Sequence, residues 1–226
     1  MLNQFIFKPL RASLKIHLFC FLCVSLTISA QKYRDFQNIK LQDSTIYMVC
    51  RGTKAKSGFI AEKFNLQDKN STHVGIGYLE NRSLKIFNVS DTKSEAGSSL
   101  IVDSLNSFIT KDTYYISIWK CNNKPQDFEN LKKICEKHKA SKIKFDFSFN
   151  IEDDEKMYCS EFCCKVLVET NGDNFQFRPS IIQLDGFYKS VVHQDQLTFY
   201  PVDFFQANEN FTKIYDSFID NETVKL

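Results

Sequence analysis

The chain has 226 residues, of which 29 are basic and 27 acidic, giving a formal net charge of +2. Three of the basic residues lie in the first thirty, so the remainder carries about 26 − 27 = −1. A chain without a basic excess is not expected to bind nucleic acid or an anionic membrane through charge. Residues 31–226 contain no repeat and no linker rich in glycine or proline, which predicts a single domain with one hydrophobic core.

The first thirty residues are typical of a secretory signal peptide. Lys8, Arg11 and Lys15 precede an apolar run from Ile16 to Ala30, and the segment has no acidic residue. An uncleaved membrane anchor is the alternative, but a run of about fifteen residues is shorter than the ~20 needed to cross a bilayer. We therefore expect cleavage near Ala30, export to the periplasm or the medium, and no stable membrane insertion afterwards.

The next part of the chain favours strands. Runs rich in β-branched and aromatic residues predict strands at 45–50, 73–78, 84–89 and 113–120. A hairpin turn at 80–82 joins the second and third of them. Short helices are expected at 57–64 and 103–109. Consecutive strands joined by short connections predict an antiparallel sheet.

Two longer helices follow. The segment 125–139 begins with proline and carries its acidic residues early and its basic residues late, as the helix dipole favours. The segment 158–170 is apolar on most sides, which predicts a buried helix, and Gly172 stops it. The rest of the chain is irregular, with a strand at 197–200 and a short helix from Asp203. The predicted fold class is α+β, an antiparallel sheet packed with helices.

Three histidines remain beyond the signal segment. His138 lies on the apolar side of the 125–139 helix near its C-terminal end, where a structural role is favoured. His193 lies in a polar loop with no organised surroundings. His73 opens a predicted strand, so its ring is expected to project from the end of the sheet. That position suits a catalytic base and a structural histidine bonded to backbone equally well.

The cysteines beyond the signal segment are Cys50, Cys121, Cys135, Cys159, Cys163 and Cys164. An exported protein could pair them, although a chain with this much core does not need disulfides. Cys159 differs from the others because it begins a helix, where free N–H groups favour a thiolate and a developing oxyanion. With an imidazolium at His73 nearby, we expect its pKa to lie below that of a free thiol. Cys159 is thus a candidate nucleophile.

Two motifs together resemble a known family. The strand HVGIGY at 73–78 and the helix start MYCSEF at 157–162 are similar to the permuted papain-like amidases of the YiiX/YaeF type, a branch of the NlpC-type peptidases. That family's histidine strand reads S-H-V-G-I and its nucleophile motif Y-C-S-E-L. Its D-F-x-F stretch is matched at 146–149. The order of histidine before cysteine is the one that a circular permutation implies, and the resemblance covers about residues 41–210.

The resemblance implies a circularly permuted NlpC/papain-like fold and a cysteine hydrolase. Such an enzyme cleaves amide or ester bonds through an acyl-enzyme, on peptide or cell-wall material. Cys159 would be the nucleophile, His73 the base, and Asn88, fifteen positions after His73, the residue that orients the imidazole. Neighbours of the nucleophile are expected to contribute to substrate binding: Tyr158, Ser160 and Glu161. The chain departs from the family at Ser44-Thr45, where Gly-Asp is usual, and at Phe145, where Tyr is usual.

No cofactor and no metal are expected. The acidic run Glu152–Glu155 lacks the spacing of an EF-hand. The expected partner is a peptide, cell-wall or acyl substrate. Two alternatives stay open. One is a lipid acyl hydrolase or acyltransferase, since lecithin–retinol-acyltransferase-like proteins share the permuted order, although their nucleophile signature reads N-C-E-H-F. The other is a catalytically degenerate binding domain of the same fold.

Overall fold

A computed structural model describes residues 39–54, 59–92 and 97–219. The predicted signal segment lies outside these ranges. The chain divides into two units between Leu41 and Gln42, and the account below concerns the second. Within the described ranges, no helix is both long enough and apolar enough to span a membrane.

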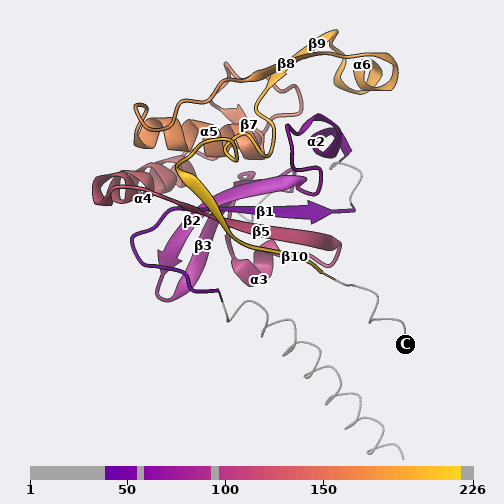
Figure 1. Cartoon of the computed structure of the whole chain (residues 1–226). Helices are drawn as coiled ribbons and strands as arrows, with labels where there is room; N and C mark the ends of the chain where they lie inside the picture. The colour runs from indigo at the N-terminus through magenta and orange to yellow at the C-terminus, as the bar shows by residue number, and fades with distance from the viewer. Residues whose placement is uncertain (1–38, 55–58, 93–96, 220–226) are drawn as a thin grey trace, which may run out of the picture. The chain divides into compact units, whose positions relative to one another are not determined.

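The elements follow one another along the chain in a mixed order of strands and helices (Figure 1). Their bounds are β1 Tyr47–Thr53, α2 Phe59–Phe64, β2 His73–Glu80, β3 Ser83–Val89, β4 Leu100–Ser104, α3 Leu105–Phe108, β5 Thr113–Cys121, α4 Pro125–Ala140, β6 Lys144–Phe145, β7 Lys156–Met157, α5 Cys159–Thr170, β8 Ser180–Gln183, α6 Gly186–Val192, β9 Gln196–Phe199 and β10 Phe211–Phe218.

Six of the strands form one antiparallel sheet in the order β10-β5-β1-β2-β3-β4. The two remaining pairs, β6 with β7 and β8 with β9, form small sheets of their own. The predicted hairpin turn between β2 and β3 is confirmed. Asn81 and Arg82 have φ of 52° and 63°, as a two-residue turn with positive φ at both positions requires. This architecture confirms the α+β class.

The two faces of the sheet have different coverings. Helices α4 and α5 lie on one face, and α3 lies on the other (Figure 1). Side chains alternate between faces along a strand, and Cys50 and Val74 are register partners that both belong to the core beneath α5. Their neighbours Arg51 and His73, which are also register partners, therefore lie on the opposite face with α3.

The short helix expected from Asp203 is wrong: residues 202–207 form turns. The carboxylate of Asp203 accepts hydrogen bonds from the backbone N–H groups of Leu66, Gln67 and Asp68 at 2.9, 2.6 and 2.9 Å. These tertiary contacts hold residues 202–207 in turns, although their local sequence favours a helix. The helix predicted at 103–109 is shorter than expected, because β4 continues to Ser104, whose side chain caps α3 by accepting from Ser107 N–H.

Candidate active site

His73 and Asn88 meet at the end of the central sheet. His73 is the first residue of β2, and Asn88 lies near the end of β3. Their side chains are joined by a hydrogen bond of 2.9 Å between His73 Nε2 and Asn88 Oδ1. Gly75 makes this approach feasible, because a Cβ at that position would lie 3.1 Å from Asn88 Cβ and 2.6 Å from Ile86 Cγ2. The glycine of the H-V-G motif thus has a steric role in the site.

A third residue fixes the orientation of the amide. Asn88 Nδ2 donates to Asp103 Oδ2 at 2.9 Å and to the carbonyl oxygen of Ile101 at 3.4 Å. Both partners only accept, so the NH₂ group must face them and Oδ1 must face the histidine. Because Oδ1 also only accepts, Nε2 of His73 carries the proton and Nδ1 keeps a free lone pair. Asp103 therefore sets, through Asn88, the tautomer that a general base requires.

Cys159 lies at the first position of α5, against the start of β2. The N–H groups of Val74 and Ser160 hydrogen-bond its sulfur, and the charge of Arg51 also acts on it. Val74 directly follows His73, so the structure brings the predicted nucleophile and base to the same strand end. Cys159 is 8% exposed, whereas the other five cysteines are at most 1% exposed, and all six are unpaired.

Burial disfavours the expected thiolate–imidazolium ion pair of Cys159 and His73, because it disfavours the charged form of each group. Burial raises the pKa of Cys159, and the two backbone donors and Arg51 only oppose that rise. Burial and then the charge of Arg51 lower the pKa of His73 to about 3, against the opposing effect of Asn88. The prediction of a depressed thiol pKa is therefore wrong for this state, in which desolvation outweighs the helix N-terminus. Burial thus favours a neutral thiol at Cys159 and a neutral imidazole at His73.

Arg51 is a site residue that sequence reasoning missed. Its guanidinium carbon lies 4.7 Å from the centre of the Phe108 ring, and Nη1 donates to the carbonyl oxygen of Phe108. The His73 ring lies 5.7 Å from the same Phe108 ring. A basic residue in a strand carries no signal of its own. Only the register, which pairs Arg51 with His73, identifies it.

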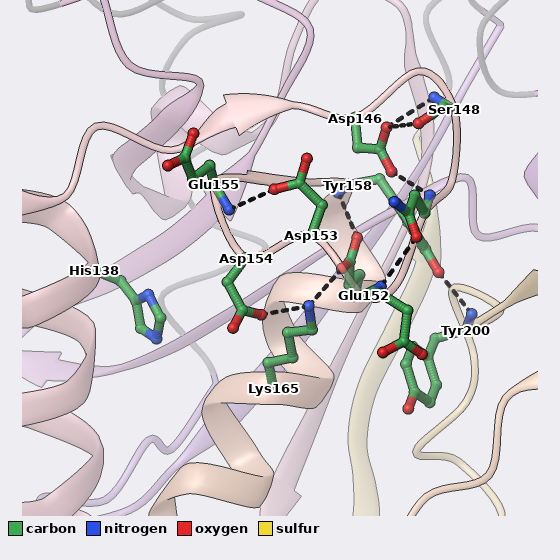
Figure 2. A network of polar contacts seen from close by, with 12 residues as sticks. His138, Asp146, Ser148, Glu152, Asp153, Asp154, Glu155, Tyr158, Lys165 and Tyr200 are labelled. Atoms are coloured by element: carbon green, nitrogen blue, oxygen red, sulfur yellow. Dashed lines mark hydrogen bonds and ion pairs between the residues drawn. The ribbon is translucent and has the colours of Figure 1, made fainter.

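The three predicted binding residues beside the nucleophile are engaged in internal contacts. The hydroxyl of Tyr158 accepts from Tyr200 N–H at 2.8 Å, and the hydroxyl of Ser160 donates to the carbonyl oxygen of Tyr200 at 2.7 Å. Glu161 is fully buried and pairs with Lys165 at 2.9 Å. Lys165 also pairs with Asp154 at 2.7 Å (Figure 2). These contacts hold the start of α5 in place.

Burial has a clear electrostatic effect on Glu161. Desolvation raises the pKa of its carboxyl group to about 7, although Lys165 and the N–H of Tyr158 oppose this. Tyr158 N–H donates to Glu161 Oε2 at 3.3 Å, which closes the first turn of α5. The acidic loop that precedes the helix is ordered by its own contacts, since Asp146 accepts from Ser148 and Asn150 (Figure 2). Glu161 thus belongs to the support of the nucleophile.

The C-terminal segment connects the two halves of the site. Tyr200 holds the start of α5, and Asp203 holds the loop that leads to His73 through its three backbone contacts. Val202 N–H donates to Asn65 Oδ1 at 3.1 Å, and Asn65 in turn donates to the carbonyl oxygens of Asp68 and Ser71. One short stretch of chain therefore positions both the nucleophile and the base.

The other two histidines lie elsewhere. His138 is on α4 and bonds Glu169 of α5 at 2.9 Å, and His193 is exposed at the end of α6. Within the described ranges, no three His, Cys, Asp or Glu side chains gather as a metal site would need. The acidic residues at 152–155 are used in turns and in the contact between Asp154 and Lys165.

Comparison with known proteins gives one informative match. No family model matches the chain, and no curated protein matches it. Among solved structures, the crystal structure of the metalloprotein YiiX (DUF1105) from Escherichia coli O157:H7 is similar, with a TM-score of 0.57 and 14% identity. The alignment covers 79% of this chain and 99% of that one. The chain therefore shares its fold with YiiX.

Proposed function

We propose that this chain is an exported cysteine hydrolase with a circularly permuted NlpC/papain-like fold that cleaves an amide or ester bond through an acyl-enzyme. The observation that carries the proposal is the fixed tautomer of His73, whose free Nδ1 belongs to the same strand end that contacts Cys159. The YiiX-like fold and the Y-C-S-E and H-V-G motifs support the same conclusion.

The reaction follows from these positions. The Cys159 sulfur attacks the substrate carbonyl carbon while His73 Nδ1 takes the thiol proton, and the carbonyl oxygen becomes an oxyanion. The N–H of Cys159, in the first turn of α5, has no partner within the helix and can stabilise that charge. The intermediate collapses as His73 gives its proton to the leaving amine or alcohol, which leaves a thioester. His73 then removes a proton from water, the hydroxide attacks the thioester, and acid and free thiol are released.

The neutral resting pair affects how the nucleophile is formed. Because the pKa of Cys159 is raised and that of His73 lowered, proton transfer must accompany the attack rather than precede it. No step requires a metal or another cofactor. Serine hydrolases use the same logic, with a neutral nucleophile and a histidine oriented by a third residue.

The test compares two cysteine variants on a panel of substrates. The protein from its native host is assayed on cell-wall peptides, simple peptide amides and lipid acyl esters. We expect Cys159→Ala to abolish hydrolysis and Cys135→Ala, in the core on α4, to retain it. Mass spectrometry should find the acyl group on Cys159. Hydrolysis that survives in Cys159→Ala would refute the proposal, turnover of lipid esters alone would favour the lipid enzyme, and no turnover at all would favour a binding domain.

A further inference from the structure

Arg51 is held at the candidate site by contacts that leave most of its donors unused. Its side chain stacks on Phe108 and donates one hydrogen bond, to the carbonyl oxygen of that residue. Its Nε is buried and has no partner among the described residues. An unsatisfied buried donor destabilises the fold. A structure that keeps a guanidinium in this state favours a ligand that can accept from it.

The charge of Arg51 is also without a direct counter-ion. No carboxylate in the described ranges lies within 4.0 Å of its nitrogens, although Asp103, Asp112 and Asp91 act on it from farther away. Those three carboxylates offset part of the positive charge of Arg51. They make a ligand with one negative charge more favourable here than a doubly charged phosphate. The planar fork of arginine suits a carboxylate, which can accept two parallel hydrogen bonds.

Arg51 lies close to His73, the candidate base. It is the register partner of His73, and both side chains contact the Phe108 ring. Its charge acts on both His73 and Cys159. A carboxylate bound by Arg51 therefore lies beside His73, the candidate base, rather than at a distant subsite.

We propose that Arg51 determines specificity, holding a carboxylate of the substrate close to the bond that Cys159 attacks. The substrate class is then an acidic peptide or another acyl compound with a free carboxylate near the scissile bond. This inference rests on the proposed function, because it assigns a substrate class to the same site.

The test uses two small probes that differ only in charge, so no substrate need be known. Iodoacetate and iodoacetamide both alkylate a cysteine, but only iodoacetate carries a carboxylate. The rate constants for Cys159 are measured at pH 8.5 by mass spectrometry of its peptide. We expect the iodoacetate-to-iodoacetamide ratio to exceed that of N-acetylcysteine amide about tenfold, which corresponds to 1.4 kcal/mol.

Matched variants identify the source of that ratio. Arg51→Gln should return the ratio to that of the small thiol, and Arg51→Lys should give an intermediate ratio because it keeps the charge and loses the fork. Arg82→Gln removes an exposed arginine at the opposite end of β2 and should leave the ratio unchanged. If Arg51→Gln does not fold, protection of the wild-type protein decides: acetate should slow alkylation by iodoacetamide, and acetamide and inorganic phosphate should not.

The outcomes separate this inference from the proposed function. A ratio equal to that of the small thiol, or one that Arg51→Gln leaves unchanged, would overturn the role of Arg51 while Cys159-dependent hydrolysis stands. Stronger protection by phosphate than by acetate would overturn the carboxylate. If Cys159 reacted with neither reagent in the folded protein, the proposed function and this inference would both fail.

Discussion

Two histidines in this molecule make the same hydrogen bond with opposite surroundings. His73 Nε2 lies 2.9 Å from the amide oxygen of Asn88, and His138 Nε2 lies 2.9 Å from a carboxylate oxygen of Glu169. Asn88 is buried and held by Asp103, whereas the Glu169 side chain is 38% exposed and also pairs with Lys137. The bond length alone therefore does not mark a catalytic histidine.

The two histidines differ in their hydrogen-bond partners and in the residues around them. A buried amide held in one orientation fixes the imidazole of His73 with Nδ1 unprotonated, while the partner of His138 is a carboxylate shared with Lys137. His138 packs edge-on against Phe162, in the body of α5, with ring centres 5.8 Å apart. His73 instead lies where the first turn of the same helix meets β2. One helix thus packs against a structural histidine along its body, and its first turn meets the strand that begins with the candidate base.

Alanine substitutions of the two histidines should give the largest contrast. Loss of a general base typically costs 10²–10⁴-fold in rate, so His73→Ala should lower hydrolysis by that factor. His138→Ala should retain hydrolysis and lose about 1–2 kcal/mol of unfolding free energy, from a hydrogen bond and an edge contact. Activity assays and chemical denaturation of both variants measure this.

Unfolding data must show that a loss of activity is not caused by a loss of folding. His73→Ala must unfold as cooperatively as the wild type, so that lost activity reflects chemistry. If His138→Ala or His193→Ala were the inactivating change, the assignment of the base would be wrong.

The pH dependence of alkylation should give the next largest effect. In a thiolate–imidazolium pair, the reactivity of Cys159 would level off between two pKa values. Here burial raises the pKa of Cys159 and lowers that of His73 to about 3, so the thiol stays protonated through neutral pH. We expect alkylation by iodoacetamide to rise about tenfold per pH unit from pH 6 to pH 9, following the thiolate fraction. A plateau that His73→Ala removes would instead demonstrate the ion pair.

The sequence predicts the parts of this protein that depend on local pattern. Four strands of the central sheet and the helices α4 and α5 coincide with the predicted segments within a few residues. The family resemblance implied Asn88, fifteen positions after His73, as the partner of that histidine, and the structure contains this contact. The strands β4 and β10 were not predicted. These segments are extended because β4 pairs with β3 and β10 pairs with β5 in the sheet.

What the sequence could not predict depends on tertiary placement. Asp103 and Arg51 join the site through the pairing of β4 with β3 and of β1 with β2, and neither lies in a motif. The thiol pKa was predicted in the wrong direction, because the helix N-terminus is visible in the sequence and the extent of desolvation is not. Asp203 looked like the start of a helix, and its role is to hold the loop before His73.

The partners of the two histidines should give the smallest contrast. Asn88→Ala removes the group that fixes the tautomer of His73 but leaves the base present, so we expect hydrolysis to fall about tenfold, near 1.4 kcal/mol. Glu169→Gln replaces a partly exposed carboxylate with an amide of the same shape. Because exposed ion pairs contribute about 0–1 kcal/mol, the unfolding free energy should fall by no more than that, and hydrolysis should be unchanged.

Without Asn88, the imidazole of His73 can still sample the correct tautomer, which is why Asn88→Ala keeps measurable hydrolysis. Rescue by Asn88→Gln is not expected, since the longer amide cannot reach both Asp103 and His73 from the same backbone position. If Asn88→Ala and Glu169→Gln had equal effects on hydrolysis, the amide beside His73 would have no orienting role, and the difference between the two histidines would rest on Cys159 alone.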